Sequence, residues 1–473
     1  MAYVVGGFVR DQMRGERSRD VDVVVQRKGI EFGKAVARAL KAHYHVRHEG
    51  FESGRIVWTH RGRRWQIDVS TIKGRTIHED LAKRDFTVNA LALPVQGSFR
   101  DAWKRLEEAP RGRIDAVKGW LRPVSASIFR KDPVRLLRAA RFAVENGLVL
   151  TPALNRLAVQ EARRIRRGTK ERLCEEWSRI LLWHKSHRAL KLLDQWGVLA
   201  ALFPELTVMK KVGQSLYHHL DVWDHTMEVV RWVDRWPELL KGFPEKIRAE
   251  VERYLEQEVV PHRSTKTTVL KTAALFHDVK KPQTKKIMPD GKITFYGHDK
   301  KGARVAHQAA RWLKMSHLEV KSIERIVGLH LRPGFLRLPE RGVSIRGAMK
   351  FFREAGDDVT GILLFSLADR WAARGPKVTK KILARTRSTV KELFDLYLGQ
   401  YQRVEPIRLI TGTDVMKACG LAPGPLVGKT LEAVREAQLA GEILTRREAL
   451  ALAKDYIRQL MVSPSPLVGE GKG

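Results

Sequence analysis

Short apolar runs alternate with turn residues over the first hundred positions of the chain. The runs YVV (3–5), VDVVV (21–25), RIVWTH (55–60) and WQIDVS (65–70) are rich in Val and Ile and are separated by Gly and Arg. Such runs are typical of β-strands. Between them, residues 31–43 (EFGKAVARALKAH) have the apolar spacing of a helix. The pattern predicts a small N-terminal domain in which strands and helices are mixed.

The period of the apolar positions changes at about residue 125, from two to between three and four. Successive short helices are expected over 125–205, and helical patterns continue to about residue 395. A stretch rich in Gly and Pro follows at 404–430, and a strongly helical segment covers 429–460. The last residues, 463–473 (SPSPLVGEGKG), have no periodicity and are expected to be disordered.

The amino-acid composition, and above all the net charge, indicates what kind of partner the chain binds. The chain has 473 residues, enough for roughly three domains. It contains 88 Lys and Arg against 53 Asp and Glu, which gives a formal net charge of +35. This excess favours a polyanionic partner such as a nucleic acid, because neutralising phosphates releases counterions. A contribution to solubility alone is the alternative.

Two further features restrict where the protein acts. Cys174 and Cys419 are the only cysteines, which excludes a disulfide scaffold and a thiolate zinc cage and favours the reducing cytoplasm. No run approaches the ~18 apolar residues of a membrane helix, so no membrane partner is expected.

The first chemical motif, GGFVRD, directly follows the first predicted strand. Gly6 and Gly7 allow the backbone to approach a phosphate closely, and Arg10 can pair with that phosphate. Asp11 completes the motif as a further candidate for nucleotide binding. Taken alone, Gly-Gly at the end of a strand is more often only a turn.

Two carboxylates lie two positions apart at the start of the next predicted strand. Asp20 and Asp22 precede the apolar run VVV, and residues i and i+2 of a strand point to the same face. Like charges held this close repel each other, and a divalent cation between them removes the repulsion. The pair therefore predicts a catalytic Mg²⁺ site, with a solvated pair on an edge strand as the alternative. Asp68 is a weaker third candidate, because a lone Asp in an amphipathic strand often faces water.

A third motif, KRDFTVNA (83–90), places a basic pair next to a carboxylate and an amide. Arg84, Asp85 and Asn89 suit the binding of a triphosphate and a ribose. The motif is weakly specific on its own, but it lies within the same 141 residues as the other motifs.

A fourth motif spaces one carboxylate and three guanidinium groups at intervals of three. Asp132, Arg135, Arg138 and Arg141 would be neighbours along a helix, where nine residues rise roughly 13 Å, about the reach of a nucleoside triphosphate. Asp132 can accept from the amine of cytosine or adenine, and Arg135 can donate to the ring acceptor beside it. These side chains could select C and A without a template, while Arg138 and Arg141 meet phosphates or RNA backbone. An exposed basic helix face is the alternative for this motif alone.

Together these motifs resemble the class II tRNA nucleotidyltransferases and their relatives, the bacterial poly(A) polymerases. GGFVRD and DVD resemble the family's metal and triphosphate motif, KRDFTVNA its RRDFT-x-NA motif, KDPVR its EDxxR nucleotide-reading motif, and LCEEWSRILL its neck helix. The resemblance covers about the first 200 residues. It implies a DNA polymerase β-like head, an α+β fold with a small mixed sheet and helices. It also implies Mg²⁺ ions at Asp20 and Asp22, and two-metal addition of C and A from CTP and ATP to tRNA 3′ ends.

Two departures from the family pattern bear on the product. Lys131 stands where the family usually has Glu in the nucleotide-reading motif. Only IKGRTIHEDLAK separates the Asp68 strand from the KRDFT motif. Many complete CCA-adding members carry a longer flexible loop there, which governs the switch from C to A addition. Complete CCA addition and CC addition alone therefore both remain open.

Histidine and aspartate recur in a second series between positions 217 and 370. The series consists of His225, His277, Asp278, His298, His330 and Asp369. A His-Asp pair at the end of an apolar helix is a good donor set for a transition metal. A core histidine is the better explanation for any one member, but the ordered series favours a metal centre.

This series resembles the HD superfamily of metal-dependent phosphohydrolases, which also occurs fused behind the nucleotidyltransferase head in one bacterial branch. The resemblance implies principal ligands at His225, His277, Asp278 and Asp369. His298 and His330 would be the additional ligands of a dinuclear site that holds Mn, Ni or Fe. A phosphatase or cyclic phosphodiesterase acting on RNA ends is the implied activity.

The composition shifts and the two resemblances predict five regions. These are a catalytic head (1–124), a mostly α-helical neck (125–205), an all-α HD domain (206–395), a helical C-terminal arm that is a candidate tRNA-binding element (396–462), and the tail (463–473). A helical hairpin that only completes the body is the alternative for the arm.

Addition of C and A to tRNA is the leading interpretation, with two alternatives. A poly(A) polymerase could share the same head, but the HD region argues against it. A phosphohydrolase with an RNA-binding head is the other, and the intact Asp20 and Asp22 argue against it. A binding module has no need of clustered carboxylates beside RNA phosphate.

Overall fold

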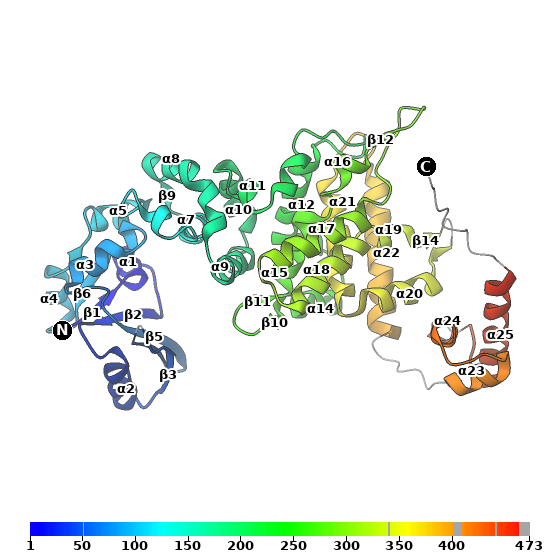
Figure 1. Cartoon of the computed structure of the whole chain (residues 1–473), viewed down its shortest axis with the longest axis horizontal. Coiled ribbons are helices and arrows are strands. Elements are labelled where there is room, and N and C mark those ends of the chain that lie inside the picture. Colours follow the sequence, from blue (N-terminus) through cyan, green and yellow to red (C-terminus); the bar gives the residue numbers. More distant parts are fainter. Residues whose placement is uncertain (51, 339–340, 402–408, 440–441, 463–473) are drawn as a thin grey trace, which may run out of the picture. The chain divides into compact units, whose positions relative to one another are not determined.

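A computed structural model of the chain describes residues 1–50, 52–338, 341–401, 409–439 and 442–462. The chain divides into two compact units, Met1–Thr207 and Val208–Gly473 (Figure 1). Within the described ranges, no helix is long and apolar enough to cross a bilayer. The predicted disordered tail at 463–473 lies outside the described residues.

A seven-stranded mixed sheet forms the centre of the first unit. Its order is β3-β4-β5-β2-β1-β6-β7, in which β2 and β5 are parallel and the other neighbours are antiparallel. The strands are β1 (Ala2–Val5), β2 (Asp20–Val25), β3 (His43–His48), β4 (Ser53–His60), β5 (Arg63–Thr71), β6 (Leu91–Pro94) and β7 (Glu107–Glu108). The mixed α+β head that the apolar runs predict is therefore confirmed.

The register of β2 and β5 decides where the acidic side chains lie. Asp22 is paired with Asp68 across the parallel ladder, and Asp20 is paired with Gln66. Paired residues of adjacent strands project to the same face, and so do residues two positions apart. The three carboxylates therefore share one face of the sheet.

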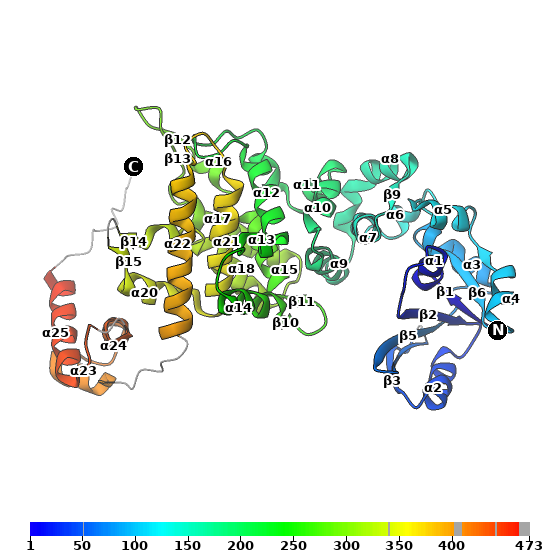
Figure 2. The ribbon, with the colours of Figure 1, turned by 180° about the vertical axis from the view of Figure 1, so that it is seen from behind.

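The helix predicted over 31–43 is wrong at its C-terminal end. Helix α2 covers Gly29–Ala39 and packs against β3, β4 and β5, and His43 already begins strand β3 (Figure 2). The sequence HYHVRH of β3 is polar and mostly exposed because the strand lies at the edge of the sheet. Of its residues Tyr44 packs into the core beneath α2 and the others are exposed, so the strand shows no apolar alternation.

Short helices surround the sheet and then continue alone, as the change of period near residue 125 predicts. In order they are α1 (Gly7–Met13), α2, α3 (Ile77–Lys83), α4 (Phe99–Lys104), α5 (Gly112–Lys118), α6 (Ile128–Lys131), α7 (Arg135–Glu145), α8 (Pro152–Glu161), α9 (Lys170–Leu182), α10 (Ser186–Gln195) and α11 (Val198–Leu202). A small parallel pair, β8 (Trp120–Leu121) and β9 (Val149–Leu150), lies among them.

The second unit is helical apart from short hairpins. Its main helices before the arm are α12 (Val222–Asp234), α14 (Glu245–Glu256), α15 (Lys266–Phe276), α17 (His298–Trp312), α18 (His317–Leu329), α20 (Ile345–Ala355), α21 (Val359–Ala372) and α22 (Lys380–Leu396). Helix α21 is apolar on nearly every side and packs against α12, α14 and α22 (Figure 2). A helix with this composition belongs in the interior, where it supports its neighbours.

The C-terminal arm contains α23 (Gly412–Cys419), α24 (Pro425–Leu439) and α25 (Arg446–Val462). The helical segment predicted over 429–460 is thus interrupted between α24 and α25. Thr445 accepts a hydrogen bond from the backbone N–H of Glu448, whose carboxylate accepts from the backbone N–H of Thr445. This reciprocal cap satisfies backbone donors at the start of α25.

Candidate functional site

A cavity of about 550 Å³ in the first unit collects the motifs of the head. Every predicted head residue except Arg141 lines it: Gly6, Gly7, Arg10, Asp11, Asp20, Asp22, Asp68, Arg84, Asp85, Asn89, Asp132, Arg135 and Arg138. These residues come from segments separated by more than a hundred positions, so only the fold brings them together. The volume is in the range of pockets that hold a small ligand.

Gly6 connects β1 to α1 at the edge of this cavity. Its φ angle is +74°, in the region that side chains disfavour. An added Cβ would also lie 3.3 Å from an Asp22 carboxylate oxygen and 3.2 Å from Nη1 of Arg84. Glycine at this position therefore lets the backbone pass close to the acidic pair.

The acidic pair is electrostatically unfavourable as it stands. Removal from bulk water raises the pKa of Asp22, and the nearby Asp68 and Asp20 carboxylates raise it further, against the opposite effect of Arg84 and Arg138. A divalent cation would remove this penalty. Two carboxylates with room for substrate phosphates are also the donor set that Mg²⁺ uses. The residues present therefore fit a Mg²⁺ site.

Asp68 differs from the pair because protein cations already hold it. Arg55 donates from Nε and Nη2 to its two oxygens at 2.6 and 2.7 Å, and Arg47 adds a contact at 3.4 Å. A carboxylate held in this bidentate way is neutralised and oriented. Asp68 lies beside Asp22 on the face of the sheet, but its charge is balanced by Arg55.

A chain of hydrogen bonds joins the first motif to the third and fourth. Arg10 donates to Asp11 and to the Oδ1 atom of Asn89, at 2.8 and 2.9 Å. Asn89 donates in turn to Asp85 at 3.3 Å, and Arg138 donates to the other oxygen of Asp85 at 2.5 Å. Burial opposes ionisation of Asp85, but Arg138 and the backbone N–H of Phe86 outweigh it and hold its pKa below the usual value.

Asp132 and Arg135 line the same cavity, although Asp132 precedes α7 and is not part of the helix. Arg135 approaches Asp132 at 3.5 Å and donates to the carbonyl oxygens of Lys83 and Arg84. Arg172 on α9 grips both oxygens of Asp132, at 2.7 and 3.1 Å. The motif spacing did not reveal Arg172.

Arg141 does not reach the cavity, which corrects its predicted contact with phosphate. It is only 8% exposed, and it pairs with Glu176 on α9 at 2.8 Å and with Glu145 at 2.7 Å. Its role is to fasten α7 to α9. Arg172 and Glu176 lie four residues apart, so one face of α9 holds both Asp132 and Arg141. Their partners lie 40 and 35 positions away in the sequence, so local spacing gave no signal for either residue.

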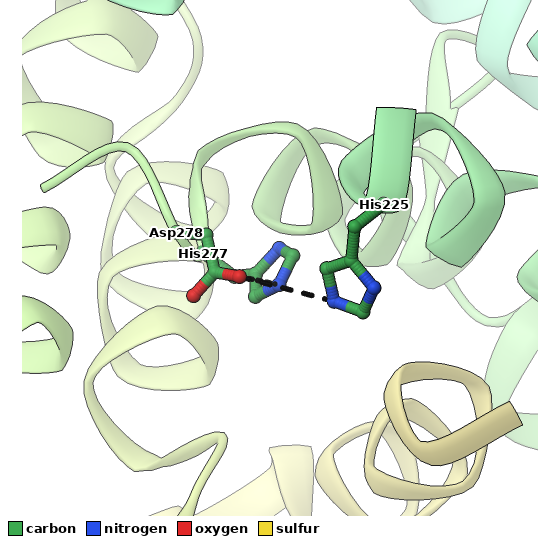
Figure 3. Close-up of side chains that lie close together, drawn as sticks. All are labelled: His225, His277 and Asp278. Carbon is green, nitrogen blue, oxygen red and sulfur yellow. Dashed lines mark ion pairs between the residues drawn. The ribbon is translucent and has the colours of Figure 1, made fainter. Parts of the chain in front are cut away.

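A second cluster lies in the second unit and contains all six members of the histidine and aspartate series. Figure 3 shows three of them, His225 from α12 and the adjacent His277 and Asp278 that follow α15. Ligand atoms of these three lie within 4.8 Å of one another, and the same holds for Asp278, His298 and His330. Asp278 belongs to both groups, as a bridging ligand would.

Backbone carbonyls orient three of the imidazoles. Nδ1 of His277, His298 and His330 lies 2.8, 2.6 and 2.7 Å from the carbonyl oxygens of Ala274, Phe295 and Val327. A carbonyl accepts only, so Nδ1 carries the proton and the Nε2 lone pair is free. Nε2 of His277 and Nε2 of His298 are buried, make no hydrogen bond of suitable geometry with the described residues, and lie 2.9 and 3.3 Å from the Asp278 carboxylate. Buried, unpaired nitrogens facing a carboxylate fit a metal ion.

The carboxylates of this cluster are held ionised. Burial would raise the pKa of Asp278, but His277 and the Lys281 ammonium, 2.6 Å away, outweigh it and hold the pKa well below its usual value. Asp369 accepts from Nε2 of His225 at 2.9 Å. Burial lowers the pKa of His330 to about 4, so that ring is neutral and able to ligate at pH 7.

Lys281 is a residue that the sequence reasoning missed. It is nearly buried, and it bridges Asp278 to Gln214 at 2.7 Å. Its position three residues after Asp278, in HDVKK, was the available signal.

Four family models match the chain. A poly A polymerase head domain covers residues 2–114, and an RNA- and SrmB-binding site of polymerase A covers 147–210. An HD domain covers 222–373, and a domain described as tRNA nucleotidyltransferase domain 2 covers 404–453.

Full-length relatives share the whole arrangement. The A-adding tRNA nucleotidyltransferase of Deinococcus radiodurans is 31% identical over 97% of this chain and 96% of its own length. The CC-adding tRNA nucleotidyltransferase of Thermus thermophilus is 30% identical over 95% of this chain and 92% of its own length.

Solved structures share the fold. A CCA-adding enzyme in complex with CTP matches with a TM-score of 0.59 at 20% identity, over 98% of this chain and 91% of that one. The Thermotoga maritima CCA-adding enzyme in complex with tRNA matches with a TM-score of 0.55 at 21% identity, over 96% and 91%.

Metal content tests the histidine cluster. We expect the wild-type protein, loaded separately with Mn²⁺, Ni²⁺ or Fe²⁺ and desalted, to retain metal and to unfold at a lower temperature after EDTA treatment. His277→Ala should weaken retention by more than about 100-fold, because a metal ligand is lost. Elemental analysis by mass spectrometry measures this. His307→Ala, which removes a half-exposed imidazole paired with Glu324, is the control. Equal metal content in both variants would contradict the assignment.

Proposed function

The chain belongs to the tRNA nucleotidyltransferase family, and on this premise we propose that it adds C and A from CTP and ATP to the 3′ end of tRNA. The observation that carries the proposal is the head cavity, in which Asp20 and Asp22 share one wall with the nucleotide-binding motifs. The charge of +35 suits an RNA partner. We assign RNA contact to the helical neck and to the arm at 396–462.

The reaction transfers a nucleotidyl group from a triphosphate to an RNA hydroxyl. The 3′ oxygen forms a bond to the α-phosphorus, and the bond from that phosphorus to pyrophosphate breaks. Mg²⁺ held by Asp20 and Asp22 would stabilise the negative charge that develops on the transferred group. Arg10 and Arg84 line the same cavity and are placed to pair with the remaining phosphates.

Base choice is proposed to rest on Asp132 and Arg135. An acceptor beside a donor complements the amine and ring nitrogen of cytosine and adenine, but not the reversed pattern of uracil and guanine. Hydrogen bonds from Arg135 to two backbone carbonyls and from Arg172 to Asp132 fix both side chains. A fixed pattern discriminates better than a mobile one, because a mismatched base leaves buried polar groups unpaired.

The full-length relatives argue against poly(A) polymerase as the function. The polymerase description applies to the head domain, whereas the relatives that cover nearly the whole chain are nucleotidyltransferases for tRNA. An A-adding and a CC-adding enzyme are almost equally similar to this chain. Whether this protein adds C, A or both therefore has to be determined from its reaction products. The segment between β5 and α3, residues 72–76, is short.

A second function is proposed for the histidine cluster, the hydrolysis of a phosphate ester at an RNA end. Two overlapping groups of three candidate ligands that share Asp278 support it, because a structural site would be closed and would not need so many donors. The metal held there would supply an activated water. Lys281, beside Asp278, is placed to pair with a phosphate oxygen.

Replacement of Asp22 tests the transferase. Asp22→Asn keeps the shape of the side chain but removes the charge, and we expect incorporation of labelled CTP and ATP to fall at least about 100-fold while tRNA binding is kept. The tRNA substrates should end at the discriminator base, at -C and at -CC, so that sequencing separates CCA, CC, A and poly(A) products. Glu31→Gln removes an exposed head carboxylate and should have no effect. Unchanged incorporation by Asp22→Asn would refute the catalytic site.

Replacement of the reading residues tests base choice. Asp132→Ala and Arg135→Ala should reduce the preference for CTP and ATP over UTP and GTP by about 10-fold or more, because one or two discriminating hydrogen bonds are lost. Affinity for triphosphate should change less, since Arg10 and Arg84 remain. Competition assays with mixed nucleotides measure the preference. An unaltered preference would remove these two residues from base recognition.

Replacement of His277 separates the two proposed activities. His277→Ala should abolish hydrolysis of p-nitrophenyl phosphate and of RNA 3′-phosphate and leave nucleotide addition unchanged, because the two sites lie in different units. Loss of both activities, with an intact melting profile, would contradict this separation.

A further inference from the structure

A second cavity, of about 370 Å³, lies in the second unit next to the histidine cluster. Its wall is formed by residues 215–218, by α19 (Arg332–Phe335) and β14 (Arg337–Leu338), and by one face each of α21 and α22. None of the activities proposed above uses this cavity.

The cavity adjoins the metal cluster through two residues. His218 lines the cavity, and its ring packs edge-to-face against His225 with the centroids 4.7 Å apart. Arg370, which also lines the cavity, directly follows Asp369 on α21, and Asp369 accepts from His225. A molecule that fills the cavity would therefore contact His218, whose ring packs directly on His225 of the cluster.

Three guanidinium groups from different elements converge on this cavity. They belong to Arg337 on β14, Arg370 on α21 and Arg385 on α22. Arg337 is paired with Glu392 at 2.7 Å. The side chains of Arg370 and Arg385 have no ion pair or hydrogen bond with any residue that the structure describes, and the lining residues include no Asp or Glu. Uncompensated arginines in a concave site attract a multiply charged anion, and their planar donors suit phosphate.

The rest of the lining suits a nucleoside. Tyr217 is 41% exposed and offers a flat aromatic face, on which any base can stack. Hydroxyl groups from Ser215, Ser366 and Thr386 can bond to a ribose. The volume suits one nucleotide rather than a duplex.

We propose that this cavity holds the 3′-terminal nucleotide of the substrate of the histidine cluster, with its base on Tyr217 and its 5′ phosphate on Arg370 and Arg385. The proposal rests on the phosphohydrolase function proposed above and names its substrate class, a nucleoside that carries phosphate at both the 5′ and the 3′ position. The 3′ phosphate then lies toward the metal cluster. Hydrolysis forms a bond from water oxygen to phosphorus, breaks the bond to the 3′ oxygen and transfers a proton to that oxygen. The products are inorganic phosphate and a 3′-hydroxyl.

Binding measured without metal isolates the arginines from catalysis. In EDTA, titration calorimetry with adenosine 3′,5′-bisphosphate should give a dissociation constant at least 10-fold weaker for Arg370→Ala/Arg385→Ala than for wild type. Tyr217→Ala should weaken binding about 5-fold or more, and Tyr217→Phe should restore it. Arg346→Ala removes an exposed arginine of the same unit, on α20, and should bind as wild type does. Any binding of the bisphosphate by the head contributes equally to the heat measured for every variant. Nucleotide addition by the head should be unchanged in all of them.

A hydrolysis assay distinguishes failure of the pocket from failure of the active site. With metal, the double arginine variant should raise the KM for a trinucleotide 3′-phosphate at least 10-fold, yet hydrolyse p-nitrophenyl phosphate as wild type does, since that ester has no second phosphate. Unchanged binding and KM in this variant would refute the proposed nucleotide pocket but leave the proposed hydrolase activity intact. Arginine-dependent binding without hydrolysis by wild type would overturn the hydrolase and leave the pocket. Tighter binding of the trinucleotide than of the free bisphosphate would assign RNA as the source, and equal binding would assign the free nucleotide.

Discussion

The head is organised by one connected set of charged hydrogen bonds. It runs from Asp11 through Arg10, Asn89 and Asp85 to Arg138 on α7. Each of these side chains would be costly to bury alone, and each is satisfied by the next. Because the members come from helix α1, from the short turn after α3 and from helix α7, the position of every motif depends on the others. The acidic pair is not hydrogen-bonded into this set, and Arg138 offsets only part of the effect that burial and the neighbouring carboxylates have on the pKa of Asp22.

The same principle continues into the neck. Arg141 and Glu176 are both nearly buried, and removal of either would take from the other the partner that it contacts with two hydrogen bonds. Their pairing fixes α7 against α9, which in turn presents Arg172 to Asp132. In the second unit the corresponding constraint is provided by backbone carbonyls, which set the tautomer of three imidazoles. In both units, groups that need not touch a substrate determine the geometry of those placed to touch it.

The parts that sequence predicts well are those with a strong period or a dense motif. The strands around Val5, Val24 and Val69 can be predicted because one face of each is buried and apolar. The HD series can be predicted because His and Asp recur in a fixed order. The edge strand at His43–His48 could not be found in this way, since Tyr44 is its one partly buried residue. The extent of the helix before it was overestimated for the same reason.

Side-chain partners were harder to predict than elements. A step of three on a helix predicted that Arg141 would follow Arg138 toward the ligand, but successive steps of three rotate slowly around the axis. After two steps the side chain faces α9 rather than the cavity. The partner that decides this, Glu176, lies 35 positions away and cannot be read from local spacing.

If Asp132 reads the base as proposed, the grip of Arg172 on its carboxylate makes that recognition an exchange rather than a simple addition. An incoming base can use the carboxylate only by sharing it with, or displacing, a guanidinium that already holds both oxygens. A ligand whose edge presents an acceptor at that point has nothing to offer in return, so the resident arginine keeps its place. On this proposal, rejection of such a base is built into the unliganded protein, before any substrate arrives.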